Sequence, residues 1–290
     1  MGLREGLRRV MDLHVHTGRS PCAVPGYGVD DVAEAAIERG VSVVAITDHY
    51  HGPGNKSTLD DLRKEVKRAR WKYAGKLKIL LGAEADILTV DGELSIEPEV
   101  ARSLDILLAG IHFVPAGGRC LPPEEKARVT PVSDRFLEIL EEGGLWDFVA
   151  DVMDAILAAV EGGLVSVIAH PLTIFADLGL TDARRGPIRR LSDLADDRYW
   201  ERLFDAARRL RVCFEVNNKF PVSDEGWGGL SEFVRRAASS GVKISLGSDA
   251  HRPEDAGCLD GALSFLERCG VPPEAVVDSL ADFRRPAEGL

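Results

Sequence analysis

Short apolar segments rich in β-branched residues alternate with longer amphipathic segments along almost the whole chain. Near-continuous apolarity in short runs is typical of parallel strands that are buried on both faces of a sheet. The expected strands are Val10–Val15, Ser42–Thr47, Leu77–Ala83, Asp105–Ile111, Val165–Ala169, Val212–Val216 and Val242–Leu246.

Between these strands, the spacing of apolar positions predicts amphipathic helices. The expected helices are Val29–Gly40, Leu59–Tyr73, Asp134–Glu142, Trp146–Glu161, Arg198–Leu210, Ser231–Gly241 and Glu254–Cys269. Gly40 and Gly241 suit the C-terminal cap of a helix. The repeated alternation of strand and helix predicts an α/β fold, a closed parallel barrel similar to a TIM barrel. A doubly wound open sheet is the alternative, but no glycine-rich phosphate-binding loop follows the first strand.

Two segments interrupt this alternation. Residues 113–163 contain a proline-rich loop followed by one or two helices, and residues 172–197 form a polar connection that carries arginines. Both follow the C-terminal end of an expected strand, where barrel enzymes build their active sites. We therefore expect rim insertions that act as lids or substrate-selecting walls, with surface decoration as the alternative. Without an internal repeat or a linker, residues 1–290 are expected to form a single barrel domain.

Composition narrows the possible partners. The 290 residues are 45% hydrophobic and carry a formal net charge of −11, which indicates a globular protein and disfavours binding to extended nucleic acid. A small phosphorylated substrate remains compatible, because a local metal cluster outweighs distant carboxylates. The five cysteines are scattered without a C-x-x-C pair, so we expect a reducing, cytoplasmic setting. No apolar run predicts a signal peptide or a membrane span, and the oligomeric state stays open.

Side chains that ligate metals follow the expected strands at their C-terminal ends. They are His14, His16, His49, Glu84, His112, His170, Asp249 and His251. In a parallel barrel these ends meet at one rim. Imidazole and carboxylate groups suit zinc, manganese or iron, and their number exceeds what one ion needs. The pattern therefore predicts a multinuclear site for divalent metal ions, whereas the H-x-H pair alone would also fit two polar residues at a strand end.

Seven motifs in the chain resemble the PHP family, named for polymerase and histidinol phosphatase. They are DLHVHT (Asp12–Thr17), TDH (Thr47–His49), GAE (Gly82–Glu84), GIH (Gly110–His112), AHP (Ala169–Pro171), EVN (Glu215–Asn217) and SDAH (Ser248–His251). They occur in family order over most of the chain. The resemblance implies a distorted seven-stranded (β/α) barrel and a metal-dependent phosphoesterase, which uses a hydroxide activated by a dinuclear or trinuclear site.

The resemblance also implies how the ligands divide among the ions. His14, His16, Glu84 and Asp249 would hold one ion; Glu84 would bridge to a second ion, which His112 and His170 complete; His49 and His251 would bind a third. Glu84, Asp249 and His251 are the expected catalytic residues. Asp12, which shares the strand face of His14 by period-two spacing, is expected to accept a hydrogen bond from a ligand, and Asp48 and Asn217 are expected to support the ligands in the same way.

One position departs from the family pattern, and one histidine lies outside it. Many relatives complete the third site with a histidine in the loop after H-x-H, but here that loop contains Cys22. A thiolate binds zinc or iron, so Cys22 is the expected substitute; a weak third site, or a cysteine that is simply buried, is the alternative. His51 matches no ligand position. We expect it to be a solvent-exposed loop residue, with a substrate contact or proton donor as the alternative.

Cationic side chains near the rim are candidates for phosphate binding. They are Arg19, Lys219 and Arg252, followed by Arg184, Arg185, Arg189 and Arg190 in the second insertion. The leading interpretation is a phosphoesterase that acts on a small phosphorylated metabolite. The alternatives are a nuclease or cyclic-nucleotide phosphodiesterase, an enzyme with amidohydrolase chemistry, and an inactive metal-binding domain. Amidohydrolases commonly bridge their metals with a lysine, so the glutamate of GAE argues against that class.

Overall fold

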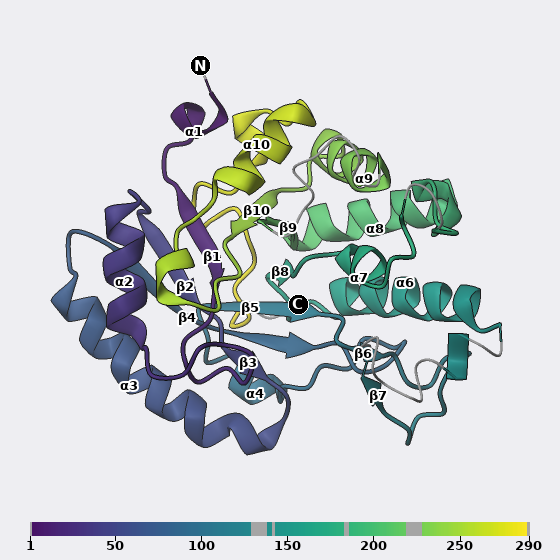
Figure 1. Cartoon of the computed structure of the whole chain (residues 1–290), viewed down its shortest axis with the longest axis horizontal. Helices are drawn as coiled ribbons and strands as arrows, with labels where there is room; N and C mark the ends of the chain where they lie inside the picture. The colour runs from purple at the N-terminus through teal and green to yellow at the C-terminus, as the bar shows by residue number, and fades with distance from the viewer. Residues whose placement is uncertain (1, 129–137, 141–142, 183–185, 219–227, 289–290) are drawn as a thin grey trace.

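The computed structural model describes residues 2–128, 138–140, 143–182, 186–218 and 228–288 (Figure 1). Its centre is a parallel sheet whose strands run in the order β1 (Met11–Val15), β2 (Val43–Ile46), β4 (Lys78–Asp86), β5 (Ile106–Gly110), β8 (Val167–Ile168), β9 (Cys213–Asn217) and β10 (Ile244–Gly247). The short strand β3 (His49–Tyr50) pairs with β4, and β6 (Phe113–Val114) pairs with β7 (Ala127–Arg128) in a separate antiparallel ribbon. All seven expected strands are confirmed.

The sheet curves until its first and last strands meet. At the C-terminal end of β1, the amide of His16 donates to the carbonyl of Ala250 at 3.0 Å, and the amide of Asp249 donates to the carbonyl of His14 at 2.8 Å. These bonds join β1 to the residues that follow β10. The predicted α/β barrel is therefore confirmed as a nearly closed barrel of seven parallel strands, and closure brings the two ends of the sheet together at the metal-ligand motifs.

Helices surround the strands (Figure 1). They are α1 (Leu3–Gly6), α2 (Val29–Glu38), α3 (Lys56–Lys72), α4 (Pro98–Ala101), α6 (Leu145–Glu161), α7 (Thr173–Asp177), α8 (Asp197–Leu210), α9 (Gly228–Ser239) and α10 (Asp260–Arg268), with short 3-10 turns η1 (Pro53–Asn55), η2 (Leu191–Asp193), η3 (Pro253–Asp255) and η4 (Pro273–Ala275). Gly40 and Gly241 follow α2 and α9 with φ of 70° and 80°, as their predicted capping role requires.

The expected helix over Glu254–Cys269 is wrong in its first part. There the chain forms η3 and then a turn at Gly257, whose φ is 79°, before α10 begins at Asp260. The amide of Gly257 donates to the buried carboxylate of Asp12 at 2.8 Å, and this tertiary contact replaces a helical hydrogen bond. The expected helix over Asp134–Glu142 lies largely outside the described residues.

The core has two layers. The barrel interior is filled by apolar side chains from successive strands, and Val277 and Phe283 of the C-terminal segment pack with them. This inner layer consists of Met11, Leu13, Val43, Ala45, Leu80, Ile106, Leu108, Val167, Ala169, Cys213, Val277 and Phe283. A larger apolar layer lies between the strands and the helices. Because both faces of each strand are buried, the strands read as continuous apolar runs.

The first insertion, residues 113–163, contributes to the barrel itself. Its helix α6 buries Phe148, Val152 and Ile156 among other side chains and packs beside α8 in the helical layer. The expectation of a rim feature applies to its earlier part, where β6 and β7 lie. All five cysteines are free thiols. Within the described ranges, no helix combines the length and the apolarity needed to cross a membrane.

The loop after β4 contacts α6 through a glycine, and this contact generates a stability prediction. Gly92 has a φ of 79°, and a Cβ there would lie 2.5 Å from the backbone nitrogen of Ala159, whereas Gly179, with a φ of 69°, has open space around it. Gly179→Ala is expected to cost about 1 to 2 kcal/mol for the left-handed backbone alone. Gly92→Ala adds an overpacking cost and is expected to lose about 2 to 5 kcal/mol in total.

Urea unfolding followed by circular dichroism measures both values. Equal losses in the two variants would show that the contact between Gly92 and α6 has no energetic weight.

Candidate metal centre

The carboxylate of Glu84, at the C-terminal part of β4, lies buried at the centre of the rim. Its Oε2 atom is 3.3 Å from Nε2 of His14, 3.5 Å from Nε2 of His16 and 3.0 Å from Nδ1 of His49. Its other oxygen, Oε1, lies on the opposite side, 2.9 Å from Nε2 of His170 and 3.5 Å from Nε2 of His112. The two carboxylate oxygens of Glu84 thus face two different groups of imidazoles.

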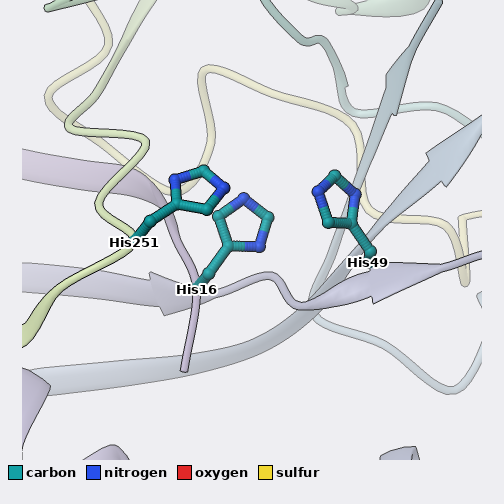
Figure 2. A group of neighbouring side chains, drawn as sticks. All are labelled: His16, His49 and His251. Atoms are coloured by element: carbon teal, nitrogen blue, oxygen red, sulfur yellow. The ribbon is translucent and has the colours of Figure 1, made fainter. Parts of the chain in front are cut away.

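A third group of ligand-type side chains lies at the closure between β1 and β10. Nε2 of His16 is 3.3 Å from Oδ1 of Asp249, and the rings of His16 and His251 lie 4.4 Å apart. Figure 2 shows His16 with His251 on one side and His49 on the other, and ligand atoms of these three residues lie within 4.8 Å of one another. Ligand atoms this close to one another can all bind the same metal ion.

Most of these rings are held by their Nδ1 atoms, which leaves Nε2 to face the cluster. The Nδ1 partners are a Glu215 oxygen for His14 at 2.8 Å, the Ser20 hydroxyl for His16 at 3.0 Å, an Asp86 oxygen for His112 at 2.8 Å and the Asp249 carbonyl for His251 at 2.8 Å. Metal-ligating histidines characteristically use one ring nitrogen in this way, which orients the other toward the ion.

Glu84 and His16 have the protonation states of metal ligands, whereas the pKa of two other rings is raised: burial opposes their charged form, but Glu215 and Glu84 outweigh it at His14, and Cys22 and Glu84 at His49. Burial would raise the pKa of Glu84, but the neighbouring His14 and His112 outweigh it and hold that pKa well below its usual value. Burial lowers the pKa of His16 to about 3, so its ring is neutral. An ionised carboxylate and a neutral imidazole are the ligating forms. In addition, Oε2 of Glu84 and Nδ1 of His49 are buried and, although 3.0 Å apart, do not have the geometry of a hydrogen bond, so both atoms are available to coordinate an ion.

Two of the predicted ligands have a strained backbone. His170 and Asp249 adopt positive φ angles of 32° and 51°, a conformation that costs non-glycine residues free energy and that clusters at functional sites. The amide of His170 is held by Oε2 of Glu215 at 2.7 Å, and the amide of Asp249 by the carbonyl of His14. Both strained residues are therefore fixed by neighbours within the same centre.

Glu215 is a residue that sequence analysis quoted only as part of the EVN motif. It contacts both His14 and the backbone of His170, and its approach requires Gly247 on β10, where a Cβ would lie 2.1 Å from Oε1 of Glu215. The sequence feature that could have revealed Glu215 is a single glutamate within a largely apolar strand. All five positions of that strand, β9, are buried. A buried charge in a strand interior needs a partner, and here the partners are ring and backbone N–H groups of the centre.

Asp86 is the second residue that sequence analysis missed. It is buried on β4, two positions after Glu84, and accepts hydrogen bonds from Nδ1 of both His112 and His51 at 2.8 Å. The expectation of an exposed His51 is therefore wrong. Its ring is only partly exposed and lies parallel to that of His49, with 5.0 Å between the ring centroids, because Asp86 draws it toward the centre.

Asp12 does not contact a histidine ring, contrary to expectation. It accepts from the amides of Ser248 and Gly257 at 2.8 Å, and from the amide of His14 at 3.4 Å. The register of β1 against β2 shifts between Asp12 and Val15, which breaks the strict alternation that placed Asp12 with the histidines. Asp12 therefore fastens β1 to the chain after β10.

The other two predicted supporting residues contact ligand-bearing segments. Asp48 accepts from the hydroxyl of Ser20 at 2.9 Å, and Ser20 in turn contacts His16; Asp48 also holds the amide of Thr17 at 2.6 Å. The side-chain amide of Asn217 donates to Oδ2 of Asp249 at 3.3 Å.

Cys22 is exposed, so the alternative of a small buried apolar residue is wrong. Desolvation opposes the thiolate, but hydrogen bonds to His251 and His49 outweigh it and lower the pKa of Cys22 to about 6. The thiol therefore interacts with the two histidines for which the family resemblance requires a third ligand, although the groups of ligand atoms that lie within 4.8 Å of one another in the described residues do not include Cys22.

The predicted phosphate contacts differ in their surroundings. Arg19 is paired with Glu65 on α3 at 2.7 Å, whereas Arg252 is exposed directly after His251. Lys219, Arg184 and Arg185 lie outside the described residues, and Arg189 and Arg190 are exposed.

Comparison with known proteins gives a consistent result. A family model described as the PHP domain matches residues 12–220. A probable phosphatase of Caldanaerobacter subterraneus is 26% identical over 285 residues, covering 96% of this chain and 91% of the relative. The probable phosphatase YcdX of Escherichia coli is 27% identical over 274 residues, covering 92% and 89%.

Among solved structures, the histidinol phosphate phosphatase of Lactococcus lactis, complexed with zinc, L-histidinol and phosphate, has the same fold. Its TM-score is 0.61 at 16% identity, and the match covers 92% of this chain and 94% of that one.

The contacts of Glu215 predict its effect on metal binding. The Glu215 carboxylate accepts hydrogen bonds through both oxygens, one from the His14 ring and one from the His170 amide. In Glu215→Gln only one oxygen remains as an acceptor, so one of these two hydrogen bonds is lost. We expect the affinity for added Zn²⁺, measured by equilibrium dialysis, to fall about 10- to 100-fold.

Asp151→Asn is the matched control, because Asp151 is a buried carboxylate on α6 that accepts from the amides of Arg119 and Cys120. It is expected to lower stability and to leave Zn²⁺ affinity unchanged. Equal losses of affinity in the two variants would refute a specific role for Glu215.

Proposed function

This chain belongs to the PHP domain family, and on that basis we propose that it is a metal-dependent phosphoesterase that hydrolyses phosphate monoesters of small metabolites. The observation that carries the proposal is the position of Glu84, whose two oxygens face two separate groups of histidines. A carboxylate between two imidazole groups is the arrangement expected of a ligand that bridges two metal ions.

We assign the ligands as follows. One divalent ion is held by His14, His16, Glu84 and Asp249, and a second by Glu84, His112 and His170. A third site is formed by His49, His251 and the thiolate of Cys22, with His16 close enough to contribute. Zinc, manganese and iron suit this set of nitrogen, oxygen and sulfur donors. When bound, divalent ions acidify a water molecule and stabilise the charge that develops on transferring phosphoryl oxygens.

Burial indicates where the substrate enters. The side chains of His14 and His16 are 0% exposed, whereas those of His112 and His251 are 21% and 24% exposed. The deep histidines therefore anchor ions, and the phosphate approaches over the partly open side formed by His112 and His251.

Three residues have proposed roles at this entrance. Asp249 is catalytic through its place in the first metal site, and its carbonyl fixes the ring of His251 by accepting from Nδ1, which leaves Nε2 of His251 facing the third metal site, on the open side of the centre. Arg252 is exposed beside it and supplies a charge for the phosphate. Arg19 is less suited because Glu65 already neutralises it, and Lys219 stays a prediction.

The acidic net charge of −11 favours a small substrate over nucleic acid, because extended nucleic acid is bound mainly through basic surfaces. A screen of the zinc-, manganese- or iron-loaded protein against phosphate monoesters, phosphodiesters and amides tests this directly. Turnover of monoesters supports the proposal, whereas turnover of only diesters or amides, or of nothing, would overturn it.

Removing Glu84 or His14 is expected to destroy the centre. Glu84→Ala removes the proposed bridge between the two metal sites. His14→Ala removes a fully buried ligand of the first ion. We expect metal content, measured by plasma mass spectrometry, to fall by at least one ion per chain, and phosphatase activity to fall by three orders of magnitude or more, which is about 4 kcal/mol in transition-state stabilisation. Full activity in either folded variant would refute the assignment.

The proposed role of Cys22 predicts a change in stoichiometry. In Cys22→Ser, a hydroxyl replaces a thiolate and binds zinc poorly, so the number of tightly bound ions per chain is expected to drop by one while the sites around Glu84 remain filled. Cys258→Ser, which changes a partly buried free cysteine elsewhere, is the control. An unchanged metal count in Cys22→Ser would remove Cys22 from the site.

A further inference from the structure

A cavity of about 590 Å³ lies beside the metal centre. It is formed by the segment after β3, the loop that follows β4 and the C-terminal end of α6, and its volume is typical of pockets that bind small molecules. None of the proposed metal ligands lines it. The cavity therefore has no role yet in the proposed function.

His51 forms the wall between the cavity and the centre. It lines the cavity, while its ring lies parallel to that of His49 with centroids 5.0 Å apart. Its Nδ1 is held by Asp86, which also holds His112. Only the ring of His51 thus separates the cavity from the side chains that we assign to the metals. Asp86 fixes the orientation of this ring and also holds His112, an assigned ligand.

The walls of the cavity are mainly apolar. Leu88, Leu94 and Leu164 line it and are only partly buried. Each of these leucines leaves apolar surface facing the cavity, and covering such surface is favourable in proportion to its area. Of the charged side chains in the lining, Glu93 and Lys126 are exposed, and Glu97 accepts a hydrogen bond from the hydroxyl of Tyr50 at 2.8 Å. The lining therefore suits an apolar group rather than a polyhydroxylated sugar, which would lose its hydrogen bonds to water there.

We propose that this cavity binds the organic group of the substrate and that it selects phosphate monoesters of alcohols with an aromatic or branched aliphatic group. The inference rests on the proposed phosphoesterase function. The phosphate occupies the entrance near His112 and His251, and the apolar group passes His51 into the cavity. His51 is a specificity-determining residue in this arrangement, because its ring lies between the metal centre and the cavity. The position of that ring determines how wide the opening between them is.

Two esters with similar leaving groups measure the selectivity. Ethyl phosphate and 2-phenylethyl phosphate are both esters of primary alcohols, so they differ mainly in the phenyl group. We expect kcat/KM to be about 10- to 100-fold higher for 2-phenylethyl phosphate, the range that burial of one aromatic group provides. The preference should appear mainly in KM, since the phenyl group lies away from the reacting atoms.

Variants of Leu94 test whether the cavity is the source of the preference. Leu94→Trp fills the cavity and Leu94→Ala removes one of its apolar walls, so each is expected to lower the ratio of the two kcat/KM values by about threefold or more. The two changes act in opposite ways on volume, so a misfolded tryptophan variant still leaves the alanine variant as a test. Leu280→Trp is the matched control at a half-buried leucine that packs against the barrel interior, and it should leave the ratio unchanged.

The outcomes separate this inference from the function on which it rests. Absence of turnover of both esters by the metal-loaded wild-type protein would count against the phosphoesterase itself. Turnover of both esters with equal kcat/KM, or a preference that both Leu94 variants retain in full, would leave the phosphoesterase standing and refute the cavity as the binding site.

Discussion

The buried carboxylate of Glu84 is the constraint on which the rim of this barrel depends. An ionised group inside a protein is unfavourable unless it is paired and hydrogen-bonded. Here the compensation comes from the imidazoles of β1 and β3 and from those that follow β5 and β8. The curvature of the sheet is what brings these strand ends around a single carboxylate, so the fold and the centre are mutually dependent.

Further buried carboxylates hold this arrangement in place. Asp12 binds backbone amides of the chain after β10, and Glu215 holds both the ring of His14 and the strained backbone of His170. Asp48 acts on His16 through Ser20, and Asp86 acts on His112 directly. These acceptors orient the rings, so that Nε2 of most histidines faces the cluster. Such preorganisation is what a catalytic metal site requires.

The centre has a closed side and an open side, and the cavity adjoins it through His51, whose ring stacks on that of His49. His14 and His16 are sealed beneath the closure between β1 and β10, whereas His112 and His251 remain accessible. His51 belongs to both regions, since it shares Asp86 with His112 and lines the cavity. Under the proposed function, chemistry and substrate selection are linked through the buried carboxylate of Asp86, and a change in the cavity that moves His51 is expected to be transmitted to His112.

The local pattern of apolar and polar residues was enough to predict the strands of this protein and the ligand-type residues at their ends. The strands were predictable because each is buried on both faces, and the ligand-type residues at their ends were predictable because parallel strands in a barrel end at one rim. Asp12 was misplaced because a register shift in β1 breaks the period of two, and His51 because its partner, Asp86, is 35 positions away in the chain. Glu215 and Asp86 were missed for the same reason: a hydrogen bond between distant residues leaves no local periodicity. Sequence by itself determined the fold and the identity of the ligand-type residues, and only tertiary structure decided which carboxylates hold them, because that depends on which strand ends the closed barrel brings within hydrogen-bond distance.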